Sequence, residues 1–310
     1  MHINRLAWMV AATAIGCGGT EGSTTVPGFE DSALDAYEIG VIDLSGLPGV
    51  ASRPDERFVM VNMFKDMATG EGFEGLTGRE AYRMYGEGLR EAQTAIDSRL
   101  IWLGDVQAQV VGISDPMFQS MALLEYASPT AFLGFASQPG ENPEARTAGL
   151  EGQWLVHSTT LAEGDPASES TDSAPDELPD VETLVETTGL SADQIGRVLD
   201  GPADEPVFII ELLRFADGER STYEQYEAGI APVLTERGAR VVWRGSYDGF
   251  VLGTGEPRFD EQTVTEYPNR AAYLLTLSDP RVAAVSPFRA DGLATHWIYT
   301  AGEAAIDLGF

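Results

Sequence analysis

The segment REAYRMYGEG at residues 79–88 decides the fold, because it returns as RSTYEQYEAG at residues 220–229, which is 141 positions later. The same offset pairs residues 79–139 with residues 220–280 without a gap, and 18 of these 61 positions are identical. Chance at average residue usage would give about four identities. The sequence therefore predicts a tandem duplication of one unit, over residues 57–160 and 205–301.

Both units carry the same order of expected elements. A nearly continuous apolar run indicates a first strand that is covered on both faces, and a segment with tyrosines at helical spacing follows it. The helix of the second unit is expected to begin near Ser221, a good capping residue. In the first unit the expected elements are a strand at 58–65, a helix at 79–98, strands at 99–112 and 118–126, a helix near 129–137 and a strand near 153–159.

This order, β-α-β-β-α-β, is the ferredoxin-like motif, which places both helices on one face of a four-stranded antiparallel sheet. The other face is left bare, although the first strand is apolar on both sides and needs a cover there. We therefore predict an α+β fold in which two ferredoxin-like units pack sheet to sheet within one chain. Such a chain is a monomer with an internal pseudo-dimer.

Both copies resemble a known family in five motifs. They are Asn62-Met63-Phe64-Lys65, Tyr82-x-x-Tyr85, Trp102-x-Gly104, Glu125-Tyr126-x-Ser128-x-x-Ala131-Phe132 and the segment 289–297. The sequence is similar to the domain-of-unknown-function 1330 family of the dimeric α+β barrel superfamily over roughly 200 of its 310 residues. The resemblance implies a barrel that relatives build from two chains, with ligands bound in the barrel interior.

Charge excludes one class of partner. The chain has 49 acidic and 19 basic residues, a formal net charge of -30, which repels nucleic acid. Its one cysteine, Cys17, excludes an internal disulfide and a cysteine-built metal site. We expect no bound metal and no cofactor.

The first residues have the pattern of a lipoprotein leader. A weakly positive start and a short apolar stretch precede Ala14-Ile15-Gly16-Cys17, which looks like a lipobox. We predict a signal peptide at 1–16, lipidation of Cys17, attachment to a bacterial membrane and an extracytoplasmic location, in the periplasm or on the cell surface. An ordinary secretory signal is the alternative. Residues 17–56 are expected to form a tether and lead-in.

Two further segments lie outside the units. Residues 161–204 are expected to form an acidic linker that is disordered between Glu163 and Asp180 and has a short helix near 191–199, capped by Ser191. Residues 302–310 are expected to form a C-terminal tail.

The polar residues of the first strands are the leading site candidates. Asn62 and its counterpart Glu211 share a face with apolar neighbours, and a carboxylate in such surroundings is a plausible acid or base. The structural alternative is a bond from Glu211 to an arginine, for example Arg240 or Arg289. Further ligand-binding candidates are conserved between the two copies but also suit core packing or a structural ion pair: Tyr82, Tyr223, Trp102, Trp243, Arg146 and Arg289.

Two other patterns carry less weight. Gly70-x-Gly72-x-x-Gly75 matches a dinucleotide fingerprint, but three residues separate it from the helix and the second copy lacks it. Some barrel relatives bind haem through a histidine, and His157 is the one position in this sequence that could do so. The alternative is that His157 has a structural role. His157 pairs with Thr300 and His296 with Gln153, so neither histidine is duplicated.

Two functional classes fit these observations. The first is a membrane-anchored lipoprotein whose barrel units bind a small, partly apolar molecule or a protein partner. The second is a cofactor-independent enzyme, monooxygenase-like or isomerase-like, that uses the barrel cavity, with Glu211 as the candidate catalytic residue.

Overall fold

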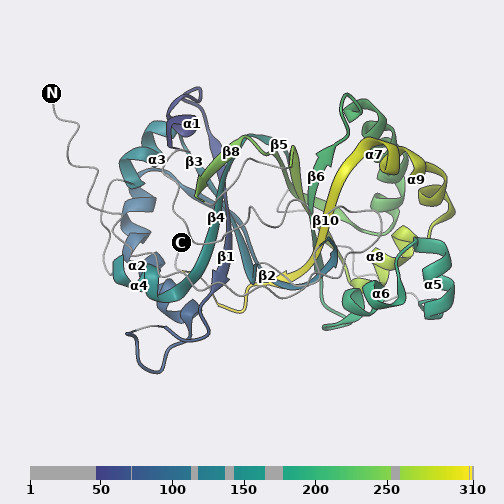
Figure 1. Ribbon diagram of the computed structural model, residues 1–310, viewed down its shortest axis with the longest axis horizontal. Coiled ribbons are helices and arrows are strands. Elements are labelled where there is room, and N and C mark those ends of the chain that lie inside the picture. Colours follow the sequence, from purple (N-terminus) through teal and green to yellow (C-terminus); the bar gives the residue numbers. More distant parts are fainter. Residues whose placement is uncertain are drawn as a thin grey trace, which may run out of the picture.

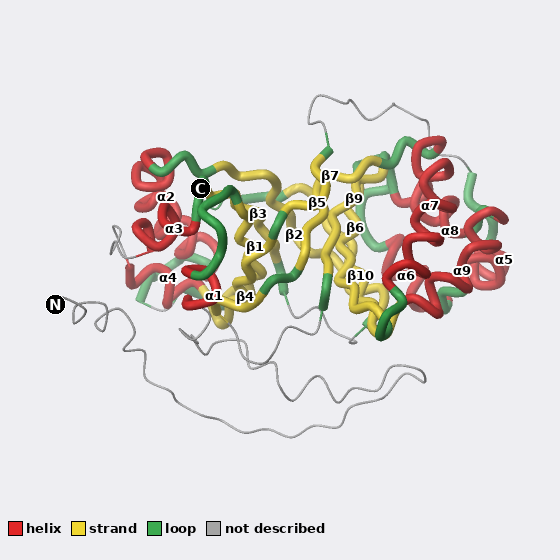
Figure 2. Tube along the Cα trace, turned by 90° about the horizontal axis from the view of Figure 1, so that it is seen from above, coloured by secondary structure: helices red, strands yellow, loops and turns green. Residues whose placement is uncertain are grey.

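The computed structural model describes residues 47–70, 72–112, 118–136, 143–164, 177–252, 259–306 and 308. Strands occupy the middle of the molecule and helices cover it at both ends (Figure 1; Figure 2). The predicted leader with Cys17 and most of its tether lie outside the described residues.

The first unit has the predicted strand arrangement. Its strands are antiparallel in the order β2-β3-β1-β4, which is the ferredoxin-like order. Short α1 (Leu47–Ala51) precedes the unit. The unit itself comprises β1 (Phe58–Asp66), α2 (Gly78–Ala95), β2 (Arg99–Val111), β3 (Ser120–Tyr126), α3 (Pro129–Ala136), α4 (Pro143–Gly149) and β4 (Leu150–Ser158), and β5 (Thr160–Glu163) continues it. The sequence analysis did not identify α4.

The second unit repeats this arrangement with the strand order β7-β9-β6-β10. Its elements are β6 (Val207–Phe215), α7 (Arg220–Glu236), β7 (Arg240–Ser246), β8 (Gly249–Leu252), β9 (Glu261–Tyr267), α8 (Arg270–Leu277), α9 (Pro280–Gly292) and β10 (Leu293–Glu303). Its first helix starts within one residue of the predicted position, but the prediction that Ser221 caps it is wrong. The helix begins at Arg220 without a side-chain cap, because the carboxylate of Glu219 accepts from the Thr222 hydroxyl, and Ser221 lies inside the first turn.

Two seams join the units into one closed barrel. At the first seam β2 pairs with β10, the last strand of the other unit. At the second seam β4 pairs with β8 and β5 pairs with β7. Along the chain β5 continues β4, and β8 continues β7. The second seam therefore joins the last strand of the first unit to the second strand of the second unit, as the first seam does with the units exchanged. One chain therefore forms the dimeric α+β barrel fold.

Strand alternation divides the side chains between two environments. On β1, Val59, Val61 and Met63 point into the barrel, where a core built from both units includes the four buried tryptophans Trp102, Trp154, Trp243 and Trp297. Phe58 and Met60 point the other way and pack under the helices. The barrel interior between the two sheets is thus a packed core, with helix-covered clusters on either side (Figure 1).

Two helices lie between the units in sequence, α5 (Val181–Thr188) and α6 (Ala192–Leu199). The second is the helix predicted near 191–199. The hydroxyl of Ser191 accepts from the Gln194 backbone N–H, and the Gln194 side chain accepts from the Ser191 N–H, which completes a capping box. Ile195 and Val198 are buried and dock α6 against β2 of the first unit and α8 of the second.

Candidate functional site

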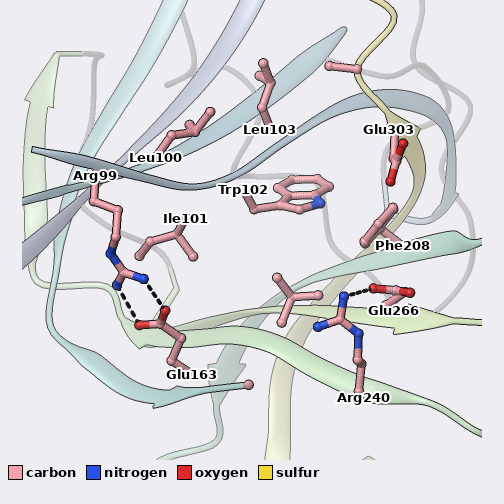
Figure 3. Close-up of a pocket in the computed structure, with 13 residues that line it drawn as sticks. Arg99, Leu100, Ile101, Trp102, Leu103, Glu163, Phe208, Arg240, Glu266 and Glu303 are labelled. Carbon is pink, nitrogen blue, oxygen red and sulfur yellow. Dashed lines mark hydrogen bonds and ion pairs between the residues drawn. The ribbon is translucent and has the colours of Figure 1, made fainter. Parts of the chain in front are cut away.

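A pocket of about 640 Å³ opens at the mouth of the barrel, where β2 and β7 begin and where β5 and β10 end. Its apolar wall includes Trp102 and Phe208, whose ring centroids are 5.3 Å apart, together with Ile101 and Val242 (Figure 3). This volume lies within the range of small-molecule sites. The pocket draws side chains from both units, so it exists only when the barrel is closed.

Ion pairs form the charged rim of this pocket. Arg99 donates to both carboxylate oxygens of Glu163, at 2.7 and 2.9 Å, and also pairs with Glu125. Arg240 pairs with Glu266 on the opposite side (Figure 3). Each arginine in the lining is therefore neutralised by a carboxylate of the protein.

Trp102 presents an unused hydrogen-bond donor in this wall. The residue is 8% exposed, and its indole Nε1 is buried without a hydrogen-bond partner in the part of the chain that the structure describes. Gly104 permits this position, since a Cβ there would lie 2.2 Å from the Cζ2 atom of the indole. A buried N–H without a partner costs free energy, so a ligand that supplies an acceptor gains from it.

The equivalent tryptophan of the second unit has its donor satisfied. Trp243 lies against Gly245 in the same way, and its Nε1 donates to Thr160 Oγ1 at 3.1 Å. Thr160 lies opposite Gly245 on the neighbouring strand, and the residue in the matching place opposite Gly104 is Glu303. The two halves of the barrel mouth therefore differ in the residue opposite this glycine, which is threonine in one seam and glutamate in the other.

The side chain of Glu303 is exposed, lines the pocket, and has no hydrogen bond or ion pair to any described residue. It lies on the side of the Trp102 ring that carries the indole nitrogen (Figure 3). An unpaired carboxylate and an unpaired indole N–H thus face the same space.

A second polar cluster lies between the sheet and the helices of the second unit. Arg289 of α9 donates to His296 Nδ1, with Nη2 at 3.0 Å and Nε at 3.3 Å. His296 Nε2 lies 2.9 Å from Glu211 Oε1, and the Thr263 hydroxyl donates to Glu211 Oε2 at 3.3 Å. Because guanidinium only donates, Nδ1 is the acceptor and the ring proton is on Nε2. His296 is therefore neutral and hydrogen-bonded to an ionised Glu211.

The pKa shifts in this cluster agree with that assignment. Burial acts to raise the pKa of Glu211, but the hydrogen bond from His296 and the charge of Arg289 outweigh it and hold this pKa below its ordinary value. Burial and then the charge of Arg289 lower the pKa of His296, against the opposing effect of Glu211. Even so, 27% of the Glu211 side chain remains accessible.

The first unit has a version of the same cluster in which an arginine meets two amide side chains and no carboxylate. Arg146 donates to Gln153 Oε1 at 2.5 Å, and Gln153 Nε2 donates to Asn62 Oδ1 at 2.9 Å. Asn62 is 6% exposed, and its amide also donates to the Met60 carbonyl. Gln153 is the counterpart of His296, and Asn62 is the counterpart of Glu211. The divergent positions noted in the sequence thus form one cluster in each unit.

Asn62 and Glu211 do not line the barrel interior, where the resemblance places ligands. Both alternate with the inward-pointing residues of their strands and therefore face the helices. Glu211 meets Arg289 through His296, whereas Arg240 pairs with Glu266.

The remaining predicted candidates fall into two groups. Tyr82 and Tyr223 pack against Phe64 and Phe215 beneath the helices, with centroid distances of 5.0 and 5.4 Å, and burial raises the pKa of both phenols. Trp243 is fully buried, and of the eight ligand-binding candidates only Trp102 lines the pocket. The sequence analysis did not identify Glu303 or Phe208. The repeated Trp-x-Gly motif was a signal for this region, but only the strand register places Glu303 opposite Gly104.

His157 and the glycine motif have structural environments. The ring of His157 accepts at Nδ1 from Arg53, 2.9 Å away, and Gly49 and Gly249 approach Nε2 so closely that a Cβ on them would lie 3.2 and 2.8 Å from it. Burial, followed by the charge of Arg53, lowers the pKa of His157 to about 4. Helix α2 begins beyond the glycine motif, at Gly78 with Thr77 as its cap.

The described residues contain neither a metal-binding cluster nor a membrane-spanning helix. No cluster of three or more histidine, cysteine, aspartate or glutamate side chains in them is placed to hold a metal ion. None of the helices in the described ranges is long and apolar enough to cross a membrane.

Comparison with known proteins shows a likeness in structure only. No family model matches the chain, and no curated protein matches it. It is similar to a candidate monooxygenase from Lactobacillus acidophilus at 10% identity, over 82% of this chain and 100% of that chain, with a TM-score of 0.43. A chlorite dismutase variant from Candidatus Nitrospira defluvii is 13% identical, over 83% of this chain and 94% of that one, with a TM-score of 0.43. A protein of unknown function from Rhodopseudomonas palustris is 18% identical over 37% of this chain and 95% of its own, with a TM-score of 0.35.

Proposed function

We propose that the chain binds a small, partly apolar molecule in the pocket at the mouth of its barrel. The observation that carries the proposal is the buried indole N–H of Trp102, which has no partner among the described residues and borders a space of about 640 Å³. The apolar wall would hold the body of the ligand, and the N–H would orient it through one hydrogen bond. The equivalent Trp243 has its partner in Thr160.

The test is native mass spectrometry of the protein purified from its own source, together with the Trp102→Phe variant. A retained small molecule in the native protein, which is lost or weakened in the variant, is the expected result. Trp243→Phe is the matched control, because its ring lies in the satisfied seam. A native protein that never carries a ligand, and that binds none in solution, would contradict the proposal.

The proposal includes a location and a family. We place the protein outside the cytoplasm, attached to a bacterial membrane through lipidated Cys17, on the strength of the lipobox pattern at 14–17. Its units would be two copies of the domain-of-unknown-function 1330 type, on the strength of the motifs shared between them. If Cys17→Ser protein still fractionates with membranes, the anchor is wrong.

A second candidate function is acid–base chemistry at Glu211. The Arg289–His296–Glu211 chain fixes the protonation of each group, and part of the carboxylate is accessible. A carbon-bound proton of a carbonyl compound could pass to Glu211 Oε2 and return to the enol carbon, so the step is balanced within one residue. It ranks second because the lowered pKa makes Glu211 a weak base. Deuterium exchange into aryl ketones that Glu211→Gln abolishes would support it, and exchange unaffected by that variant would exclude it.

A further inference from the structure

We propose that the pocket at the barrel mouth selects a small organic cation that also carries an oxygen acceptor. The positive nitrogen faces Glu303, and the oxygen accepts a hydrogen bond from Trp102 Nε1. The inference rests on the proposed ligand-binding function and adds the chemical class of the ligand.

The charges that line the pocket favour a cation. Three carboxylates and two guanidinium groups contribute, which gives a net charge of 2 − 3 = −1. Arg99 is held by Glu163 and Glu125, and Arg240 is held by Glu266. Among the charged residues of the lining, Glu303 is the one without a counter-ion in the described part of the chain. A ligand cation supplies that counter-ion without breaking an existing pair.

An anion meets the opposite situation. Reaching Arg99 would require it to displace Glu163, which binds through two hydrogen bonds of 2.7 and 2.9 Å. The unpaired Glu303 would repel it. The net charge of -30 for the whole chain also concentrates cations near its surface.

The aromatic wall adds a second attraction for a cation. Trp102 and Phe208 lie with ring planes at 52° to each other, and their edges and faces border the same space. A positive nitrogen over an indole face, within about 6 Å of the ring, is attracted by the ring quadrupole. The same rings exclude water from the apolar body of the ligand.

In the other half of the barrel a threonine hydroxyl takes the place that the ligand oxygen would take beside Trp102. Trp243 donates to Thr160 Oγ1 at 3.1 Å, so a short side chain opposite the glycine reaches the indole nitrogen. In the matching place Glu303 is longer and directs its carboxylate elsewhere. A ligand oxygen within about 3 Å of Trp102 Nε1 would restore the missing bond.

Three probes with one scaffold separate the contributions. We choose 2-phenoxyethylammonium, 2-phenoxyethanol and phenoxyacetate, which share an apolar ring and an ether oxygen and differ in charge. Titration of the full chain is followed by the indole N–H signals of its tryptophans in ¹⁵N–¹H spectra. We expect the Trp102 signal to move, with the ammonium probe binding about tenfold more tightly than the alcohol and the carboxylate binding most weakly.

Two variants at one position test the role of Glu303. Glu303→Gln keeps the size and should abolish the preference for the ammonium probe while leaving the affinity for the alcohol unchanged. Glu303→Thr copies Thr160, should engage the Trp102 N–H, and should weaken all three probes. Glu182→Gln on exposed α5 is the charge-matched control and should behave as the native protein does.

The outcomes separate the class of ligand from ligand binding itself. Equal affinity for the ammonium and the alcohol, a preference for the carboxylate, or a preference that survives Glu303→Gln would overturn the cation inference while the pocket still binds. If no probe moves the Trp102 signal, the ligand retained in natively purified protein decides: a cation supports the inference and any other molecule overturns it. No probe bound and no ligand retained would overturn the proposed function as well.

Discussion

The two units of this chain share a strand order and differ in the polar residues that they carry. Beneath its helices, the second unit joins Arg289, His296 and Glu211, while the first unit holds a neutral asparagine and glutamine at the matching positions. At the barrel mouth the tryptophan whose indole N–H lacks a partner among the described residues is in the other unit, at Trp102. Tryptophans and arginines match between the two units, whereas the polar partners described above differ. The positions that differ are therefore where a function of one unit alone is expected.

The largest expected effect comes from making the second cluster resemble the first. Glu211→Asn leaves the buried Arg289 charge without its carboxylate and should lower the free energy of unfolding by about 3 kcal/mol, at the low end for a broken buried pair because Glu211 is 27% accessible. Adding His296→Gln recreates the arginine–glutamine–asparagine hydrogen bonds of the first unit and should recover about 1–2 kcal/mol. Urea unfolding of the single and double variants measures both.

Asn62→Ala provides the comparison in the first unit. It removes hydrogen bonds between neutral groups only and should cost about 1 kcal/mol. A loss at Asn62 equal to that at Glu211 would mean that the charges of the second cluster contribute nothing beyond their hydrogen bonds.

The next effect is a pH dependence that both histidines share. An unfolded histidine binds a proton below about pH 6.5, whereas folded His157, with a pKa of about 4, does not. The unfolded state therefore binds more protons, and the free energy of unfolding should fall by about 2 kcal/mol between pH 7 and 5 for this residue. His296 acts in the same direction, because its pKa is also lowered. Glu211 adds a loss only at lower pH, below the ordinary range of a glutamate.

Chemical unfolding between pH 7 and 5 checks this dependence. His157→Gln and His296→Gln should each make the curve flatter. A native curve that rises as the pH falls would show that the histidines are protonated in the folded protein, contrary to the bonding pattern with the arginines.

A smaller effect separates the two seams of the barrel mouth. Thr160→Val leaves the Trp243 N–H without its partner and should cost about 1 kcal/mol. Glu303→Val at the matching position removes no such bond and should leave the thermal midpoint nearly unchanged. Equal losses in the two variants would mean that the halves of the mouth are equivalent.

The smallest expected effect is a gain in stability. Glu303→Thr should supply Trp102 with the hydrogen bond that Thr160 supplies to Trp243, which is worth about 0.5 kcal/mol at a partly exposed position. Differential scanning calorimetry can resolve it as a raised midpoint. A lowered midpoint would show that Glu303 already stabilises the native chain.

Much of the fold could be predicted from the sequence, because an internal repeat is recognised without knowing the structure of any single segment. The offset of 141 aligned the two units, and the apolar first strands required a cover that the second sheet provides. Helix ends were harder to place. Ser191 caps its helix as expected. Ser221 does not, because its helix begins one residue earlier, at Arg220, and Ser221 lies inside the first turn.

The candidate site was only partly readable in the sequence. Glu211, His296 and Arg289 were each noted, but which side of the strand faces the helices depends on packing between the units. Glu303 gave no local signal at all. Its importance comes from lying opposite Gly104 on the neighbouring strand. That pairing is set by closure of the barrel between the two units and cannot be predicted from a short segment of sequence.

The two indole N–H groups of the barrel mouth differ in hydrogen bonding, because Trp243 has a partner and Trp102 has none among the described residues. Hydrogen exchange measures this difference directly. In ligand-free protein, ¹⁵N–¹H spectra recorded after transfer to D₂O should show the Trp102 N–H exchanging at least tenfold faster than the Trp243 N–H, which is bonded to Thr160. Addition of a bound organic cation should then slow Trp102 and leave Trp243 unchanged. Equal exchange of the two groups, or slower exchange at Trp102, would contradict the account.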